Sequence, residues 1–170
     1  MDAGQLRSLQ APLKERYKRQ PEAAQITLRA EGRLSEGVTC QIETGKTTFK
    51  AGLHPATGGD GLSACSGDML LEALVGCAGV TLNAVATALG IQLRNAKVCA
   101  EGDLDFRGTL GVSKDVPVGF ERIRLRFELD TDASAGQVAT LIRLTERYCV
   151  VYQTLSRPAK IDVESGVTSG

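Results

Sequence analysis

The stretch Asp68–Gly90, DMLLEALVGCAGVTLNAVATALG, decides the fold because it is long, apolar and placed in the middle of the chain. Ser66 precedes it as a candidate N-cap, an acid follows in the first turn, and Gly90 is a typical residue at which a helix ends. Two acids and an asparagine interrupt the run, and no basic flank follows it, which argues against a membrane span. The stretch therefore predicts a buried central helix.

Alternating apolar and polar residues predict strands on both sides of this helix. The clearest is the segment from Arg122 to Leu129, in which every second residue is apolar. The predicted strands are residues 25–34, 38–42, 47–51, 96–107, 122–129 and 160–163, with a turn at 43–46 and a loop at 108–119. Strands followed by a helix, more strands and another helix indicate an α+β fold.

Two further helices are predicted outside the central stretch. One runs to Cys149, with Asp132 and Ser134 as capping candidates and an apolar stripe that turns Cys149 toward the core. The other is a short, weakly held helix within residues 5–24, which proline breaks at Pro12 and again near its end. We therefore expect residues 1–24 to be an extension and residues 25–170 to form a single domain.

Length and composition fit this organisation. The chain has 170 residues, enough for one domain with a core. Lys+Arg and Asp+Glu both total 20, so no net charge favours a nucleic acid or an anionic membrane as partner. The N-terminus lacks the pattern of a secretory signal, and the five cysteines are an odd number without the spacing of a disulfide scaffold. We expect a cytoplasmic protein.

Two cysteines are candidates for chemistry. Cys77 lies in the middle of the central helix and Cys149 at the end of the second amphipathic run, so packing of these helices would let the thiols form and break a disulfide. The alternative is that both are inert core residues, since free cysteines are among the most buried residue types. Gly76 and Gly79 flank Cys77, and we expect another backbone to approach closely there.

A metal or nucleotide site is not favoured. His54 is the only histidine, no two cysteines form a C-x-x-C pair, and a zinc site would need Cys65, His54 and another cysteine. The Gly-rich loop 53–62 lacks the Gly-Lys-Ser/Thr ending of a phosphate loop, and a flexible pocket wall is the better interpretation. We expect neither a metal nor a cofactor.

Several segments together resemble the OsmC/Ohr family of thiol-dependent hydroperoxide reductases. They are the HPATGGDG loop, the helix entry SGDMLLEALVGC, the strand pair DLDFRGTLG and GFERIRLRFELD, and the two cysteine contexts GCAGVTL and RYCVVYQTL. The likeness covers roughly residues 25–163. It implies two antiparallel sheets around a long central helix, in an intertwined homodimer with active sites at the subunit interface.

The resemblance also assigns roles to residues. It implies that Cys77 attacks the peroxide, that Cys149 resolves it by forming a disulfide, and that Arg33 and Asp68 support them electrostatically. Burial raises the pKa of a thiol from about 8.5, so a cation is needed beside Cys77, and Arg33 suits that task. Arg29, on the same strand face, is its competitor.

Two departures from the family pattern bear on these roles. Val150 stands where the family commonly has proline after the resolving cysteine, and Asp68 stands where it commonly has glutamate. Asp68 also precedes Cys77 by nine positions, which puts the two about 13 Å apart on opposite sides of one straight helix. Asp68 would then serve the Cys77 of a second subunit, which is a physical reason to expect a dimer.

The expected substrate is an organic hydroperoxide, reduced to its alcohol. An apolar pocket favours alkyl or lipid-derived peroxides, with His54, Phe120, Tyr148 and Tyr152 as candidate lining residues. An external dithiol, such as a lipoylated protein, would restore the thiols. The alternative is a protein of the same fold that binds a small apolar ligand at the dimer interface without catalysis.

Overall fold

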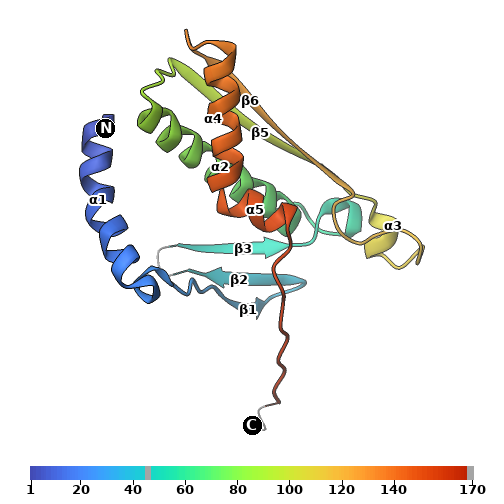
Figure 1. The fold of residues 1–170 in the computed structure, drawn as a ribbon. Helices are drawn as coiled ribbons and strands as arrows, with labels where there is room; N and C mark the ends of the chain where they lie inside the picture. Colours follow the sequence, from blue (N-terminus) through green and yellow to red (C-terminus); the bar gives the residue numbers. More distant parts are fainter. Residues whose placement is uncertain (45–46, 168–170) are drawn as a thin grey trace.

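The structure, a computed structural model, describes residues 1–44 and 47–167 and has the expected α+β architecture (Figure 1). Its elements are α1 (Ala3–Arg19), β1 (Glu31–Ser35), β2 (Thr39–Glu43), β3 (Thr48–Gly52), β4 (Ala64–Cys65), α2 (Ser66–Leu89), β5 (Asn95–Asp103), α3 (Phe106–Thr109), β6 (Arg122–Asp130), α4 (Ala135–Tyr148) and α5 (Val150–Ser156). Short 3-10 helices lie at Pro21–Ala24 and Pro55–Thr57. The predicted turn at 43–46 lies partly outside the described residues.

The central helix is α2, as predicted. Its core face presents Leu74, Ala78, Leu82 and Ala86 at intervals of four residues, and all four are buried. Gly90 ends the helix in the left-handed region, with φ of 69°, and its N–H reaches the last carbonyls. The start differs from the prediction: Ser66 is already helical, and the N-cap position is Cys65, whose side chain makes no capping hydrogen bond.

A long antiparallel hairpin of β5 and β6 packs against α2. The register pairs Asn95 with Asp130 at one end and Asp103 with Arg122 at the other. Its inner residues join the core clusters around α2, and its outer face carries ion pairs of Arg124 with Glu101 and Asp103. The predicted strand to residue 107 is too long, because the side chain of Asp105 caps the short helix α3.

The second predicted helix is α4, and it packs on α2. Ser134 and Gln137 form a capping box at its start, which confirms Ser134 as the cap. Cys149 ends α4 and is fully buried, as its stripe predicts. The sequence did not predict α5, which begins directly after Cys149.

The sheet β1–β4 lies at the other end of the molecule from α4 (Figure 1). Its first strand begins at Glu31 rather than at residue 25, and Ile26 and Leu28 are exposed. Leu34 is 93% exposed, so the apolar side of this sheet has no cover within the described part of the chain. The predicted strand at 160–163 is wrong: the segment is exposed and pairs with none of the described strands.

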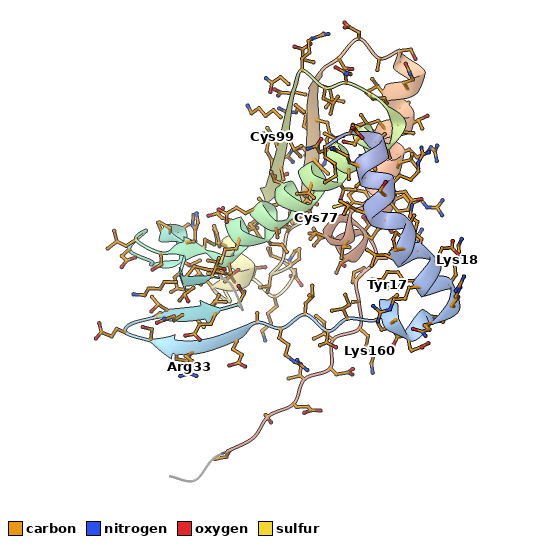
Figure 2. The ribbon with its side chains drawn as sticks, turned by 90° about the vertical axis from the view of Figure 1, so that its left-hand side faces the viewer. Tyr17, Lys18, Arg33, Cys77, Cys99 and Lys160 are labelled. Atoms are coloured by element: carbon orange, nitrogen blue, oxygen red, sulfur yellow. The ribbon has the colours of Figure 1, made fainter. Side chains whose placement is uncertain are left out.

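The N-terminal helix is longer and more regular than predicted. It continues through Pro12 and is capped at its start by Asp2 and Gln5 in a capping box. A proline removes one intrahelical hydrogen bond, but it need not end a helix whose neighbouring turns are held by other contacts. Here those contacts come from α2, because α1 lies alongside its C-terminal half (Figures 1 and 2). The division of the chain at residue 24 stays a prediction.

Candidate active site

The structure brings Cys77 and Cys149 together. Cys149 is buried with Leu74 and Ala78 in one core cluster, and Cys77 packs against that cluster from α2. Cys77 is only half-buried, so one of the two sulfurs is open to a small reactant and the other is sheltered. All five cysteines are free thiols in the structure, and Cys40, Cys65 and Cys99 lie outside this cluster.

The junction between α4 and α5 positions Cys149. Its backbone N–H donates to the Thr145 carbonyl at 2.9 Å, which closes α4, and its sulfur accepts the N–H of Tyr152 at 3.4 Å, which caps α5. The Gln153 side chain donates back to the Glu146 carbonyl at 2.8 Å and ties the two helices together. One residue therefore ends one helix and begins the next, and its sulfur is held beside α2.

The surroundings of the two thiols shift their pKa values in opposite directions. Burial acts to raise the pKa of Cys77, but the Val151 N–H, the Cys149 thiol, the Val150 N–H and the Thr81 hydroxyl donate toward its sulfur and together lower it. Burial raises the pKa of Cys149, and the neighbouring Cys77 sulfur raises it further. The pair therefore favours a thiolate at Cys77 and a proton on Cys149. A nucleophilic thiol and a resolving thiol need these two protonation states.

The sequence did not predict these hydrogen-bond donors; it predicted a cation beside Cys77 instead. Among the described residues, no cation contributes to the lowered pKa of Cys77; backbone N–H groups at the start of α5 do so. Val150 is the residue noted as a departure from the family's proline, and it supplies an N–H that proline lacks. The departure thus adds a donor to the site.

Arg33 and Asp68 do not reach Cys77 within one chain. Arg33 lies exposed on β1, opposite Gln41, in the sheet far from Cys77 (Figure 2). Asp68 is exposed in the first turn of α2, and Arg29 precedes β1 in an exposed segment. Any role of these residues at the thiols depends on a second copy of the chain and stays a prediction.

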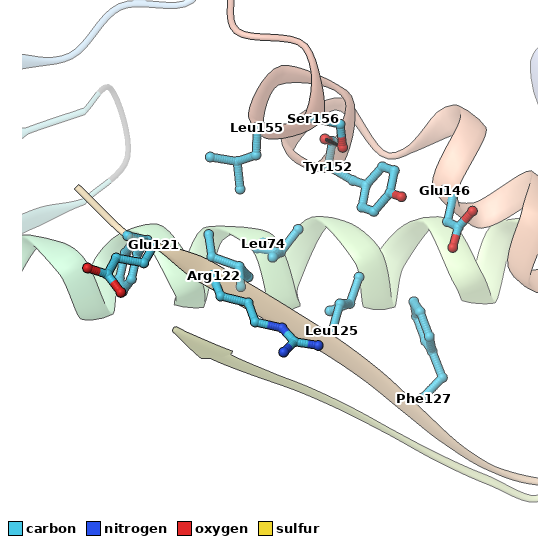
Figure 3. Close-up of a pocket in the computed structure, with 11 residues that line it drawn as sticks. Leu74, Glu121, Arg122, Leu125, Phe127, Glu146, Tyr152, Leu155 and Ser156 are labelled. Carbon is cyan, nitrogen blue, oxygen red and sulfur yellow. Dashed lines mark hydrogen bonds between the residues drawn. The ribbon is translucent and has the colours of Figure 1, made fainter. Parts of the chain in front are cut away.

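Two of the four predicted lining residues, Phe120 and Tyr152, border a cavity of about 480 Å³ next to the core cluster that contains Cys149 (Figure 3). Leu74, Leu125 and Leu155 give it apolar walls, and these residues also pack against the cluster that holds Cys149. Charged groups from Glu121, Arg122 and Glu146 lie at its border, as Figure 3 shows. The cavity therefore combines an apolar interior with a polar edge, as small-molecule sites do.

The other two predicted lining residues lie elsewhere. His54 stacks on Phe106 with ring centroids 5.0 Å apart and accepts the Ala56 N–H, beside a separate pocket that Cys65 also lines. Tyr148 is exposed at the end of α4, beneath the guanidinium of Arg147. No group of three or more His, Cys, Asp or Glu side chains within residues 1–44 and 47–167 is placed to hold a metal ion.

The family model for OsmC-like proteins matches residues 58–164, which include both cysteines. The chain belongs to the OsmC-like protein family. The match spans α2, the β5–β6 hairpin, α4 and α5, and leaves α1 outside. No curated protein matches the chain.

Solved structures share the fold of this OsmC-like chain at low sequence identity. An OsmC-like protein from Mycoplasma pneumoniae is 17% identical over 78% of this chain and 89% of its own, with a TM-score of 0.67. An organic hydroperoxide resistance protein from Legionella pneumophila is 17% identical over 79% and 92%, with a TM-score of 0.62. One from Elizabethkingia anophelis is 16% identical over 79% and 91%, with a TM-score of 0.61.

Proposed function

We propose that the protein reduces organic hydroperoxides to alcohols, with Cys77 as the nucleophile and Cys149 as the resolving thiol. The observation that carries this proposal is the adjacent pair of thiols whose pKa values are shifted in opposite directions. Two structurally similar proteins are named organic hydroperoxide resistance proteins, which supports the same chemistry.

The reaction proceeds in two steps. The Cys77 thiolate attacks one peroxide oxygen, the O–O bond breaks, and the departing alkoxide takes a proton from the Cys149 thiol to become the alcohol. Cys77 is then a sulfenic acid and Cys149 a thiolate. The Cys149 sulfur attacks Cys77, a disulfide forms, and hydroxide leaves and is protonated by water. An external dithiol, such as a lipoylated protein, returns both cysteines to thiols, and no cofactor is needed.

The cavity beside the cysteines supports an apolar substrate. Leucine and aromatic residues make up six of the eleven residues that line it, and an alkyl tail placed against them leaves water. We therefore favour alkyl and lipid-derived hydroperoxides over hydrogen peroxide. A protein that only binds a small apolar ligand would use the same cavity, and the rate of thiol oxidation separates the two functions.

We further propose an intertwined homodimer in the cytoplasm. The most apolar 18-residue stretch of α2 is only 28% buried within one chain, although its composition is that of a core helix. The space beside Gly76, where we expected a close backbone, is open within the described residues. A second copy would cover this face of α2 and the apolar side of the β1–β4 sheet, and would bring its own Arg33 and Asp68 toward Cys77.

Stopped-flow mixing of the reduced protein with cumene hydroperoxide tests the function. We expect rapid loss of two thiols per chain, and mass spectrometry should locate the new disulfide between Cys77 and Cys149. The C149S variant should lose one thiol per chain and accumulate a sulfenic acid that dimedone traps. Rates no faster than those of free cysteine, or a disulfide elsewhere, would overturn the proposal and leave a binding protein.

A further inference from the structure

A basic surface lies where α4 meets α5. Arg147 belongs to the last turn of α4, and Arg157 follows the end of α5. Between them lie the exposed ring of Tyr148 and the side chain of Val150, which is 70% exposed. The Arg147 guanidinium lies over the Tyr148 ring, 5.6 Å from its centroid. These four residues, which we call the α4–α5 corner, help to line a shallow depression of about 500 Å³.

The α4–α5 corner carries positive charge without acidic partners. No acid lines the depression. Neither of its arginines makes an ion pair within the described part of the chain, in contrast to Arg124 and Arg126 of the hairpin, which both pair with Glu101. Arg143, exposed one turn before Arg147 on the same face of α4, adds a third cation. Since Lys+Arg and Asp+Glu balance over the whole chain, the corner is a local excess of positive charge.

The corner borders the two thiols directly. Tyr148 and Val150 are the chain neighbours of Cys149. The Val150 N–H donates toward the Cys77 sulfur, while the exposed Val150 side chain lines the depression. A molecule bound there is therefore one residue away from both sulfurs. The proposed dimer uses the face of α2 at Gly76 and the apolar side of the sheet, so the corner lies outside the surfaces assigned to a second copy.

The proposed reaction ends with a Cys77–Cys149 disulfide that a partner has to reach. Cys149 is fully buried and Cys77 is half-buried, so the thiolate of a dithiol attacks the Cys77 sulfur, and Cys149 leaves as a thiolate and takes a proton. The second thiol of the reductant then attacks the mixed disulfide. This step releases Cys77 as a thiolate and the reductant as a cyclic disulfide, so two electrons pass from the dithiol to the protein.

We propose that the α4–α5 corner docks an acidic surface of the protein that carries the reducing dithiol. Carboxylates of this partner pair with Arg147 and Arg157, and Tyr148 with Val150 gives the interface an apolar centre within a charged rim. A small, charged interface suits a partner that leaves after each turnover. The inference rests on the proposed function and adds the kind of partner that regenerates the thiols.

The experiment measures the second-order rate constant for reduction of the Cys77–Cys149 disulfide, formed beforehand with diamide. The reductants are two short peptides that carry a reduced lipoyl-lysine. One has aspartate and glutamate on both sides of the lipoyl-lysine, and the other has asparagine and glutamine in their place. We expect the acidic peptide to react about three- to tenfold faster at low salt, the size of one or two exposed ion pairs. This advantage should vanish at about 1 M salt, where the Debye length is about 3 Å.

The R147E/R157E variant should reverse the preference, so that the amide peptide reacts faster. The ratio of the two rate constants cancels any effect of the substitutions on the disulfide itself. The matched control is R16E/R19E, which makes the same change of charge at two exposed arginines in the last turn of α1. This control should keep the preference for the acidic peptide.

Equal rate constants for the two peptides in the wild type, or the same loss of preference in both variants, would overturn the inference and leave the peroxidase function standing. A shift from dimer to monomer in R147E/R157E, measured by light scattering, would also overturn it, because the corner would then be an interface between copies. Diamide makes the test independent of peroxide: a protein that shows the preference but does not reduce cumene hydroperoxide keeps the docking surface and fails as a peroxidase. Failure of diamide to form this disulfide would overturn both proposals.

Discussion

Two parts of the molecule differ in how deeply their apolar side chains are buried. The first part consists of α2, β5, β6, α4 and α5, and the second is the N-terminal sheet β1–β4. In the first part, Leu82 and Leu141 are almost completely buried by neighbouring elements of the same chain. In the sheet, Leu34 and Val38 lie on one face with nothing over them within the described residues. The first part holds the thiols in a core of its own, whereas the sheet exposes an apolar face, as the proposed dimer interface requires.

The largest effect on activity should come from replacing Cys77 by serine, with the same replacement of a cysteine in the sheet as comparison. C77S should reduce the rate of peroxide reduction to the level of free solution thiols, because it removes the nucleophile, whereas C40S in the sheet should keep nearly full activity. Stopped-flow kinetics with cumene hydroperoxide measures both. A large loss of activity in C40S would show that the sheet takes part in the chemistry.

A pair of leucines compares the stability of the two halves. L82A should lower the free energy of unfolding by about 2–5 kcal/mol through loss of buried contacts and a cavity, at every protein concentration. L34D should act through association, shifting the protein from dimer to monomer in light scattering and making its Tm depend more steeply on concentration. A dimer that persists in L34D would contradict the proposed interface at this face of the sheet.

Removing one backbone donor should move the pH dependence of the first step. The pKa of Cys77 lies below its ordinary value, so the thiolate and the rate increase as pH rises through that lowered pKa. V150P removes one N–H and should raise this pKa, which moves the pH–rate profile to higher pH. We compare the rates at a pH below the pKa of Cys77 in both the wild type and V150P. There, raising the pKa of the thiol by one pH unit makes the thiolate fraction, and so the rate, about tenfold smaller.

V150A serves as the control, because it keeps the N–H. Proline is tolerated at the first position of a helix, and Cys149 before it has the extended backbone that proline favours, so V150P should fold. A profile unchanged in V150P would show that the start of α5 does not activate the thiol.

The smallest effect should come from the side-chain donor. T81V keeps the shape of Thr81 and removes the hydroxyl that donates toward Cys77, which is the weakest of the causes that lower its pKa. We expect the pH–rate profile to move in the same direction as in V150P but by less. A larger displacement than in V150P would reverse the order of the donors.

The two halves also differ in how far the sequence predicted them. The extents of α2, β6 and α4 follow from long periodic runs whose apolar face meets partners in the same chain. The strand expected from residue 25 and the one at 160–163 failed because alternation was present without a core to cover it. Alternation marks an apolar face, but it does not show whether another element of the same chain covers that face.

The site shows a similar limit. The two cysteines could be found because thiols are rare and their helix stripes point inward. The donors that lower the pKa of Cys77 could not, because backbone N–H groups at Val150 and Val151 have no residue signature and α5 was not predicted. The expected need for a cation, together with the family resemblance, led to Arg33, which the single chain leaves far from the thiols (Figure 2).

The sulfur of Cys149 has one further consequence. It accepts the Tyr152 N–H that starts α5, and the ring of Tyr152 forms part of the cavity wall (Figure 3). The same sulfur therefore contacts Cys77 on one side and, through the first turn of α5, a residue of the cavity wall on the other. A disulfide formed at this atom would take away the acceptor that caps α5, one helical turn from the cavity.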